Sequence, residues 1–128
     1  MATRRRESAH VHKAHVLFID DDAAVREAAQ LLLKVAGYRV SIATCTAEAV
    51  EHARQHRDLK IVISDYHLGH TETGVDAIAA VRAVCGPGLP AVLMSGDTGL
   101  TLTDVQRGPN TAIANKPIRA DELLALLP

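Results

Sequence analysis

Five polar residues have types and positions that together suggest one kind of chemistry. Asp20 and Asp21 follow the apolar run Val16–Ile19, Asp65 follows Ile61–Ser64, Ser95 follows Ala91–Met94 and Lys116 follows Thr111–Asn115. Three carboxylates in one crevice would repel one another, and a hard divalent cation such as Mg²⁺ relieves that repulsion. A lysine and a serine hydroxyl can hold phosphoryl oxygens. The set suits phosphoryl transfer, in which a carboxylate can itself be the nucleophile.

The runs that precede these residues predict strands. Ile61-Val62-Ile63 is β-branched throughout, as is typical of a strand buried on both faces of a parallel sheet. The runs at 16–19 and 91–94 have the same character, and 111–115 predicts a fifth strand. Residues 38–43 alternate between apolar and polar types, with Arg39 and Ser41 as the polar members. This alternation predicts a half-exposed edge strand.

Helical periodicity fills the intervals between the strands. A first helix is predicted to begin after Asp22, its N-cap, and to stop at Gly37. A second is predicted from Thr46, capped by the Thr46 hydroxyl, to about Arg57. Further helices are predicted over 74–85 and 121–127. Residues 97–110 favour only a short or irregular helix, because Gly108-Pro109 interrupts the pattern.

Five alternations of strand and helix predict an α/β fold. With right-handed crossovers we expect a flavodoxin-like (βα)5 sandwich whose parallel five-stranded sheet has the order 2-1-3-4-5. Ligands of such sheets bind outside the carboxyl ends of the strands. The order makes the strands that end at Asp20, Asp65 and Ser95 neighbours, so these groups should converge.

Composition limits the alternatives. The 128 residues suffice for one domain, predicted over 15–128, after a polar tail or linker over 1–14 that we expect to be disordered. The net charge of −1 argues against a nucleic-acid surface. No apolar run approaches the roughly 20 residues of a membrane span. The two cysteines, Cys45 and Cys85, are expected to be buried, reduced thiols of a cytoplasmic protein.

Histidines offer a weaker metal signal. His10, His12 and His15 have no specific ligand spacing. His52 and His56 lie four apart on one predicted helix and could clamp a metal, but they lack a third ligand. We therefore interpret them as surface residues. His67 and His70, in the loop after Asp65, are expected to face solvent.

Four segments in this order resemble the receiver domain of two-component response regulators. They are Val16–Asp22, Ile61–Asp65, Met94-Ser95-Gly96 and Asn115-Lys116-Pro117, and the resemblance runs from about residue 15 to the end. The Asp-Tyr-x-Leu loop, the Ser-Gly-Asp turn and the weak fourth helix are most similar to C-terminal receivers of hybrid sensor histidine kinases. In two positions the chain departs from the family: Ile113 replaces the usual switch aromatic, and Gly69 replaces a usual proline.

The resemblance implies that Asp65 accepts a phosphoryl group from a histidine kinase or histidine phosphotransfer protein. Asp21 and Asp65 would ligate Mg²⁺, or Mn²⁺ in its place, directly. Asp20 would act through water and His67 through its backbone carbonyl. Ser95 and Lys116 would hold the phosphoryl group, and the Lys116-Pro117 bond would be cis. The resemblance also allows a phosphorylation-dependent dimer, and it implies no nucleic-acid or direct membrane contact by this domain.

The resemblance does not decide whether the chain should be called an enzyme. The domain would be a switch with self-phosphorylation and slow autodephosphorylation, and the parent would be a histidine kinase if the chain is part of a hybrid kinase. One alternative function is a haloacid-dehalogenase-type phosphatase with Asp20 as nucleophile; Asp20-x-Asp22 fits it, whereas Ala24 does not. Another is a pseudo-receiver, a binding module that is not phosphorylated.

Overall fold

The computed structural model describes residues 13–69, 71–96 and 110–128. Residues 1–12 of the predicted tail, with His10 and His12, lie outside those residues, as do His70 and residues 97–109 of the predicted fourth helix. The elements follow the predicted alternation. In chain order they are β2 (His15–Ile19), α1 (Ala23–Val35), β3 (Arg39–Ala43), α2 (Thr46–Gln55), β4 (Leu59–Asp65), β5 (His67–Leu68), β6 (Glu72–Thr73), α3 (Gly74–Cys85), β7 (Ala91–Ser95), β8 (Thr111–Asn115) and α5 (Ala120–Ala125).

The main sheet has the strand order β3-β2-β4-β7-β8, which confirms the predicted order 2-1-3-4-5. All four pairings are parallel, so the carboxyl ends of the strands share one edge. The central strands β2, β4 and β7 are buried almost throughout, as their apolar runs predict. Strand β3 lies at the edge of the sheet, also as predicted.

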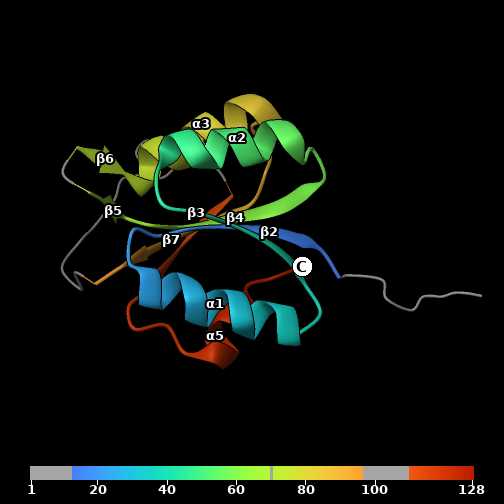
Figure 1. The fold of residues 1–128 in the computed structure, drawn as a ribbon, viewed down its shortest axis with the longest axis vertical. Coiled ribbons are helices and arrows are strands. Elements are labelled where there is room, and N and C mark those ends of the chain that lie inside the picture. The colour runs from blue at the N-terminus through green and yellow to red at the C-terminus, as the bar shows by residue number, and fades with distance from the viewer. Residues whose placement is uncertain (1–12, 70, 97–109) are drawn as a thin grey trace, which may run out of the picture.

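Helices cover the sheet on both faces (Figure 1). Helices α2 and α3 lie on one face, where they enclose a core that includes Leu17, Val62 and Leu93. Helices α1 and α5 lie on the other, over Phe18, Ile63 and further apolar side chains of the same strands. Alternate residues of β2 and β4 therefore feed opposite cores, as the two-residue period of a strand requires.

The ends of α1 agree with the sequence. The Asp22 carboxylate accepts hydrogen bonds from the backbone N–H groups of Ala24 and Val25, so Asp22 is the predicted N-cap. Gly37 follows the C-terminus with a φ of +99°, a conformation that favours glycine.

The predicted cap of α2 is wrong. Cys45 occupies the N-cap position without a side-chain hydrogen bond, and Thr46 is already helical. Two carboxylates serve this end of the helix instead, one from β6 and one from the first turn of α2 itself. The N–H of Thr46 donates to Glu72 Oε1 at 2.9 Å, and the Thr44 N–H and hydroxyl donate to Glu48 Oε1 at 2.7 and 2.8 Å.

Three further expectations need correction. Residues 67–68 and 72–73 were expected to be loop, but they pair as an antiparallel hairpin of two short strands, β5 and β6. Ser41, a polar member of the edge strand, is buried. Cys45 and Cys85 are unpaired, as expected, but both are only half-buried. Among the described helices, none has the length and apolar character needed to cross a lipid bilayer.

Candidate functional site

The acidic side chains meet at the carboxyl edge of the sheet. Asp20 directly follows β2, and Asp65 is the last residue of the neighbouring strand β4. Asp20, Asp21 and Asp65 each offer a carboxylate oxygen, and these oxygens all lie within 4.8 Å of one another. We call these three residues the acidic cluster. The sequence-based prediction that they converge is confirmed.

Asp20 is the most enclosed member of the acidic cluster, with none of its surface exposed. Its carboxylate accepts a hydrogen bond from the Asp22 N–H at 2.9 Å and faces Lys116 Nζ at 3.3 Å. Burial raises the pKa of Asp20, and the Asp22 N–H and the Lys116 charge oppose that rise. The carboxylate is therefore held in a position where a cation compensates its charge.

Lys116, the residue directly after β8, joins the acidic cluster. Its ammonium lies 3.3 Å from Asp20 Oδ2 and 3.3 Å from Asp65 Oδ1. Burial acts to lower the pKa of Lys116, but the two carboxylates outweigh it and raise the pKa. Lys116 is therefore charged and tied to both carboxylates. The Lys116-Pro117 peptide bond is cis, as expected.

Asp65 and Asp21 are the more accessible members. The Asp65 side chain is 13% exposed, whereas that of Asp20 is 0% exposed. Asp21 is exposed, and its Oδ2 accepts a hydrogen bond from the Gly69 N–H at 3.1 Å. A small ligand that approaches from solvent would therefore meet Asp65 and Asp21 before Asp20.

Ser95 and His67 are the remaining residues predicted for this site. Ser95 is the buried last residue of β7, and its carbonyl accepts a hydrogen bond from the Lys116 N–H at 2.7 Å. His67 follows Asp65 by two residues and its side chain is exposed, as predicted. Ile113, in the position of the family's aromatic, lies on β8 and is 36% exposed.

Two supporting residues had not been identified from the sequence as parts of the site. Arg26 Nη1 donates to the Asp20 carbonyl at 2.9 Å. Gly74, the first residue of α3, packs against the Asp65 carbonyl so closely that a Cβ would overlap it. A glycine at the start of a helix could have suggested a close backbone contact at position 74. Only the fold shows that the contacting backbone is that of Asp65.

The donor set fits a hard divalent cation. Carboxylate oxygens within reach of one another are the ligands that Mg²⁺ and Ca²⁺ prefer. The fully buried Asp20 lies at the inner side of the cluster, where Lys116 only partly balances the three acidic groups. The arrangement can therefore hold a cation beside Asp65 and can neutralise further negative charge brought by a phosphoryl group.

Comparison with known proteins gives consistent matches. The model of the response regulator receiver domain family matches residues 16–128. The C4-dicarboxylate transport transcriptional regulatory protein DctD of Rhizobium meliloti (strain 1021) is 36% identical over 114 residues, which cover 85% of this chain and 23% of DctD. The chain spans from 13% to 55% of the length of the curated relatives that it matches.

Solved structures agree in fold. The chemotaxis protein CheY4 of Vibrio cholerae is 28% identical, with a TM-score of 0.76, and the match covers 88% of this chain and 93% of that one. The receiver domain of the hybrid histidine kinase CckA is 26% identical, with a TM-score of 0.73 and coverage of 88% and 94%.

Proposed function

This chain belongs to the response regulator receiver domain family, and we propose that Asp65 is the residue that accepts the phosphoryl group. The chain is a phosphoacceptor receiver domain of two-component signalling, as its relatives indicate. The observation that supports Asp65 is its place in the acidic cluster. Of the two strand-end carboxylates that contact Lys116, Asp65 is the one with exposed surface.

The transfer would proceed by in-line attack of an Asp65 carboxylate oxygen on the phosphorus of a phosphohistidine. The P–N bond breaks as the P–O bond forms, and the histidine nitrogen leaves with the electron pair. Lys116 would then contact a phosphoryl oxygen in addition to Asp20. The Ser95 hydroxyl would donate a hydrogen bond to another phosphoryl oxygen.

Mg²⁺, or Mn²⁺ in its place, is the cofactor that fits this proposal. Asp21 and Asp65 would bind it directly, Asp20 through water and His67 through its backbone carbonyl. When bound, the ion neutralises charge that develops on the phosphoryl oxygens. The three carboxylate oxygens within 4.8 Å of one another support the assignment.

The partner would be a histidine kinase or a histidine phosphotransfer protein. The matches to DctD and to the CckA receiver are compatible with a regulator or with a hybrid kinase as the parent protein. A phosphorylation-dependent dimer is also part of the proposal, and light scattering before and after phosphorylation would measure it. Two unpaired cysteines support a cytoplasmic location.

The two alternative functions are not favoured. A phosphatase that used Asp20 as nucleophile would need that carboxylate to reach a substrate, but Asp20 is fully buried and paired with Lys116. A pseudo-receiver would have no need of the complete acidic cluster, which this chain retains.

Incubation with acetyl phosphate and Mg²⁺ tests the acceptor. We expect intact-mass measurement to show one added phosphoryl group that is stable in acid and labile in base, and we expect Asp65→Asn to abolish it. Asp76→Asn is the matched control, because Asp76 is an exposed aspartate on α3 outside the acidic cluster. Equal labelling of Asp65→Asn and wild type would refute the assignment.

A further inference from the structure

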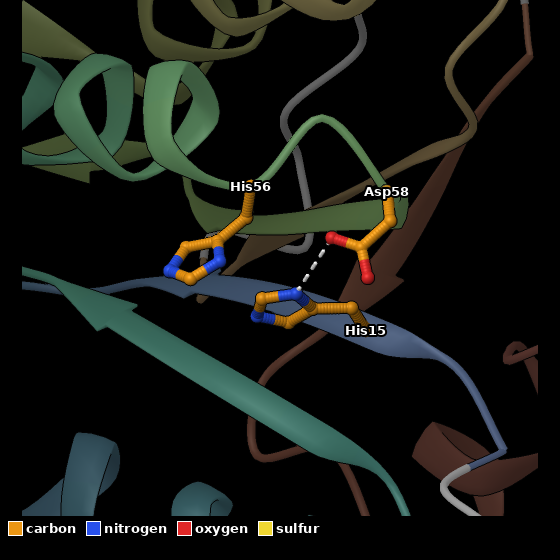
Figure 2. A group of neighbouring side chains, drawn as sticks. All are labelled: His15, His56 and Asp58. Atoms are coloured by element: carbon orange, nitrogen blue, oxygen red, sulfur yellow. Dashed lines mark hydrogen bonds and ion pairs between the residues drawn. The ribbon is translucent and has the colours of Figure 1, made fainter.

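A second cluster of polar side chains lies at the opposite edge of the sheet, where the central strands begin. His15 is the first residue of β2, Asp58 directly precedes β4, and His56 is the C-cap residue of α2. We call these three residues the basal cluster (Figure 2). The acidic cluster lies at the far ends of the same two strands, so the basal cluster is a separate site.

The spacing within the basal cluster matches that of metal ligands. His15 Nδ1 and Asp58 Oδ1 are 3.3 Å apart. Tetrahedral Zn²⁺ with bonds of about 2.0–2.2 Å separates its ligand atoms by about 3.3–3.5 Å. One nitrogen of His56 completes a set in which all three ligand atoms lie within 4.8 Å. The His56 ring lies beside the His15 ring (Figure 2). The centroids of these two rings are 4.8 Å apart.

His15 is prepared to act as a ligand. Its side chain is buried, and its Nε2 contacts the hydroxyl of the buried Ser41 at 2.8 Å. A hydroxyl can donate or accept, so Ser41 serves either tautomer of the ring. Nδ1 can therefore lose its proton to solvent while Ser41 continues to orient the ring, as outer partners of metal-bound histidines do.

The metal-facing atoms of His15 and Asp58 are hydrogen-bonded to each other, and a metal ion would replace that hydrogen bond. Arg39 contacts Asp58 through Oδ2 at 2.9 Å, and Oδ1 remains directed at His15. His52 instead contacts the Ile42 carbonyl through Nε2, with its ring centroid 6.3 Å from that of His56. The helical pair His52 and His56 is thus not the ligand set. The fold pairs His56 with His15 and Asp58.

We propose that His15, His56 and Asp58 form a Zn²⁺ site, with water as the fourth ligand. Two imidazoles and one carboxylate are typical zinc ligands, whereas Mg²⁺ prefers an all-oxygen set and should remain at the acidic cluster. The ion joins the start of β2, the end of α2 and the start of β4. Because it binds only the folded arrangement, it stabilises the domain in proportion to its concentration.

Calorimetric titration of the full chain with Zn²⁺, in saturating Mg²⁺ to occupy the acidic cluster, tests the site. We expect one Zn²⁺ per chain and a rise in melting temperature. His56→Ala and Asp58→Asn should each weaken binding by at least about 100-fold, since each removes a direct ligand. His15 is left unchanged because its burial makes a folding defect the simplest result of its removal.

The double substitution His10→Ala, His12→Ala is the matched control, because it removes two histidines that are not among the three proposed ligands. It should leave Zn²⁺ affinity unchanged. Co²⁺ in place of Zn²⁺ should give the intense visible absorption of a tetrahedral ion, and Asp58→Asn should alter that spectrum. Three results would each overturn the proposal. They are undiminished Zn²⁺ affinity in both ligand variants, loss of binding in the double control, and a six-coordinate Co²⁺ spectrum.

Discussion

Lys116 is the cation on which the charge balance of the acidic cluster depends. It lies 3.3 Å from oxygens of both Asp20 and Asp65, and these carboxylates raise its pKa against the effect of burial. Asp20 is fully buried, so removal of Lys116 would leave the negative charge of Asp20 without a compensating cation. A divalent cation and Lys116 therefore share the same negative charges.

Replacement of Lys116 by methionine should separate cation binding from phosphorylation. We expect Lys116→Met to bind Mg²⁺ several-fold more tightly than wild type, because a competing positive charge is removed. Labelling by acetyl phosphate should fall on the order of 10²-fold, because a phosphoryl oxygen loses its cationic partner. Calorimetry measures the first effect and intact mass the second. Lys116→Arg is the control that keeps the charge, and weaker Mg²⁺ binding by the methionine variant would contradict this account.

Gly74 couples helix α3 to the acceptor position. Its N–H donates to the Tyr66 carbonyl at 2.7 Å, and a Cβ on Gly74 would overlap the Asp65 carbonyl and crowd a Leu93 methyl. Gly74→Ala should therefore destabilise the domain by about 1–3 kcal/mol, as overpacking does. It should also slow labelling by displacing Asp65. Urea unfolding measures the first effect.

Gly88→Ala is the matched control for this substitution, because a Cβ there meets no atom within 4 Å. Its stability should stay within about 0.5 kcal/mol of wild type. Equal stability of both alanine variants would contradict the packing argument.

Glu48 makes the start of α2 sensitive to acid. Hydrogen bonds from the Thr44 N–H and hydroxyl lower the pKa of Glu48 below its ordinary value of 4.5. The folded state thus binds this proton more weakly than the unfolded state does. The stabilisation is present above pH 4.5 and is lost as the pH falls through the folded-state pKa.

Glu48→Gln should reveal this contribution. We expect the free energy of unfolding of wild type to exceed that of the variant by less than about 1 kcal/mol near neutral pH, since the group is exposed. The difference should shrink as the pH falls below 4.5. Urea unfolding at a series of pH values measures it, and a difference that grows in acid would be inconsistent with the hydrogen bonds described.

At the scale of the molecule, one of the two cores lies between the sheet and the helices α1 and α5. Leu33 is fully buried in that core, whereas Leu31 on the same helix is 67% exposed. Leu33→Ala should cost about 2–5 kcal/mol in the free energy of unfolding. Leu31→Ala should change the free energy of unfolding by no more than about 0.5 kcal/mol. Thermal or urea unfolding of the pair tests which face of α1 packs, and equal losses would contradict the observed packing.

Much of this fold follows from local patterns in the sequence. The β-branched run at Ile61–Ile63 predicted a central strand, and the strand ends predicted that Asp20, Asp21 and Asp65 converge. Both inferences need only the period of a strand and the rule that parallel strands end at one edge.

The basal cluster could not be predicted in the same way. His15 contacts Ser41 and Asp58 because three strand starts align, and no spacing in the sequence encodes that alignment. The contact of Glu72 with the start of α2 was missed for a similar reason, since Glu72 comes from a strand distant in the chain. The hairpin of β5 and β6 was missed because two-residue strands are too short to show alternation.

That hairpin determines how the chain beside Asp65 can vary in length. Its two strands are paired to each other rather than to the main sheet, and Leu68 anchors them in the core. Gly69, which follows Leu68, donates its N–H to Asp21 Oδ2 at 3.1 Å, so residues added after Leu68 would displace a donor to the acidic cluster. The contact with Asp21 therefore restricts the length of this segment, while Leu68 holds its base beside the acceptor carboxylate.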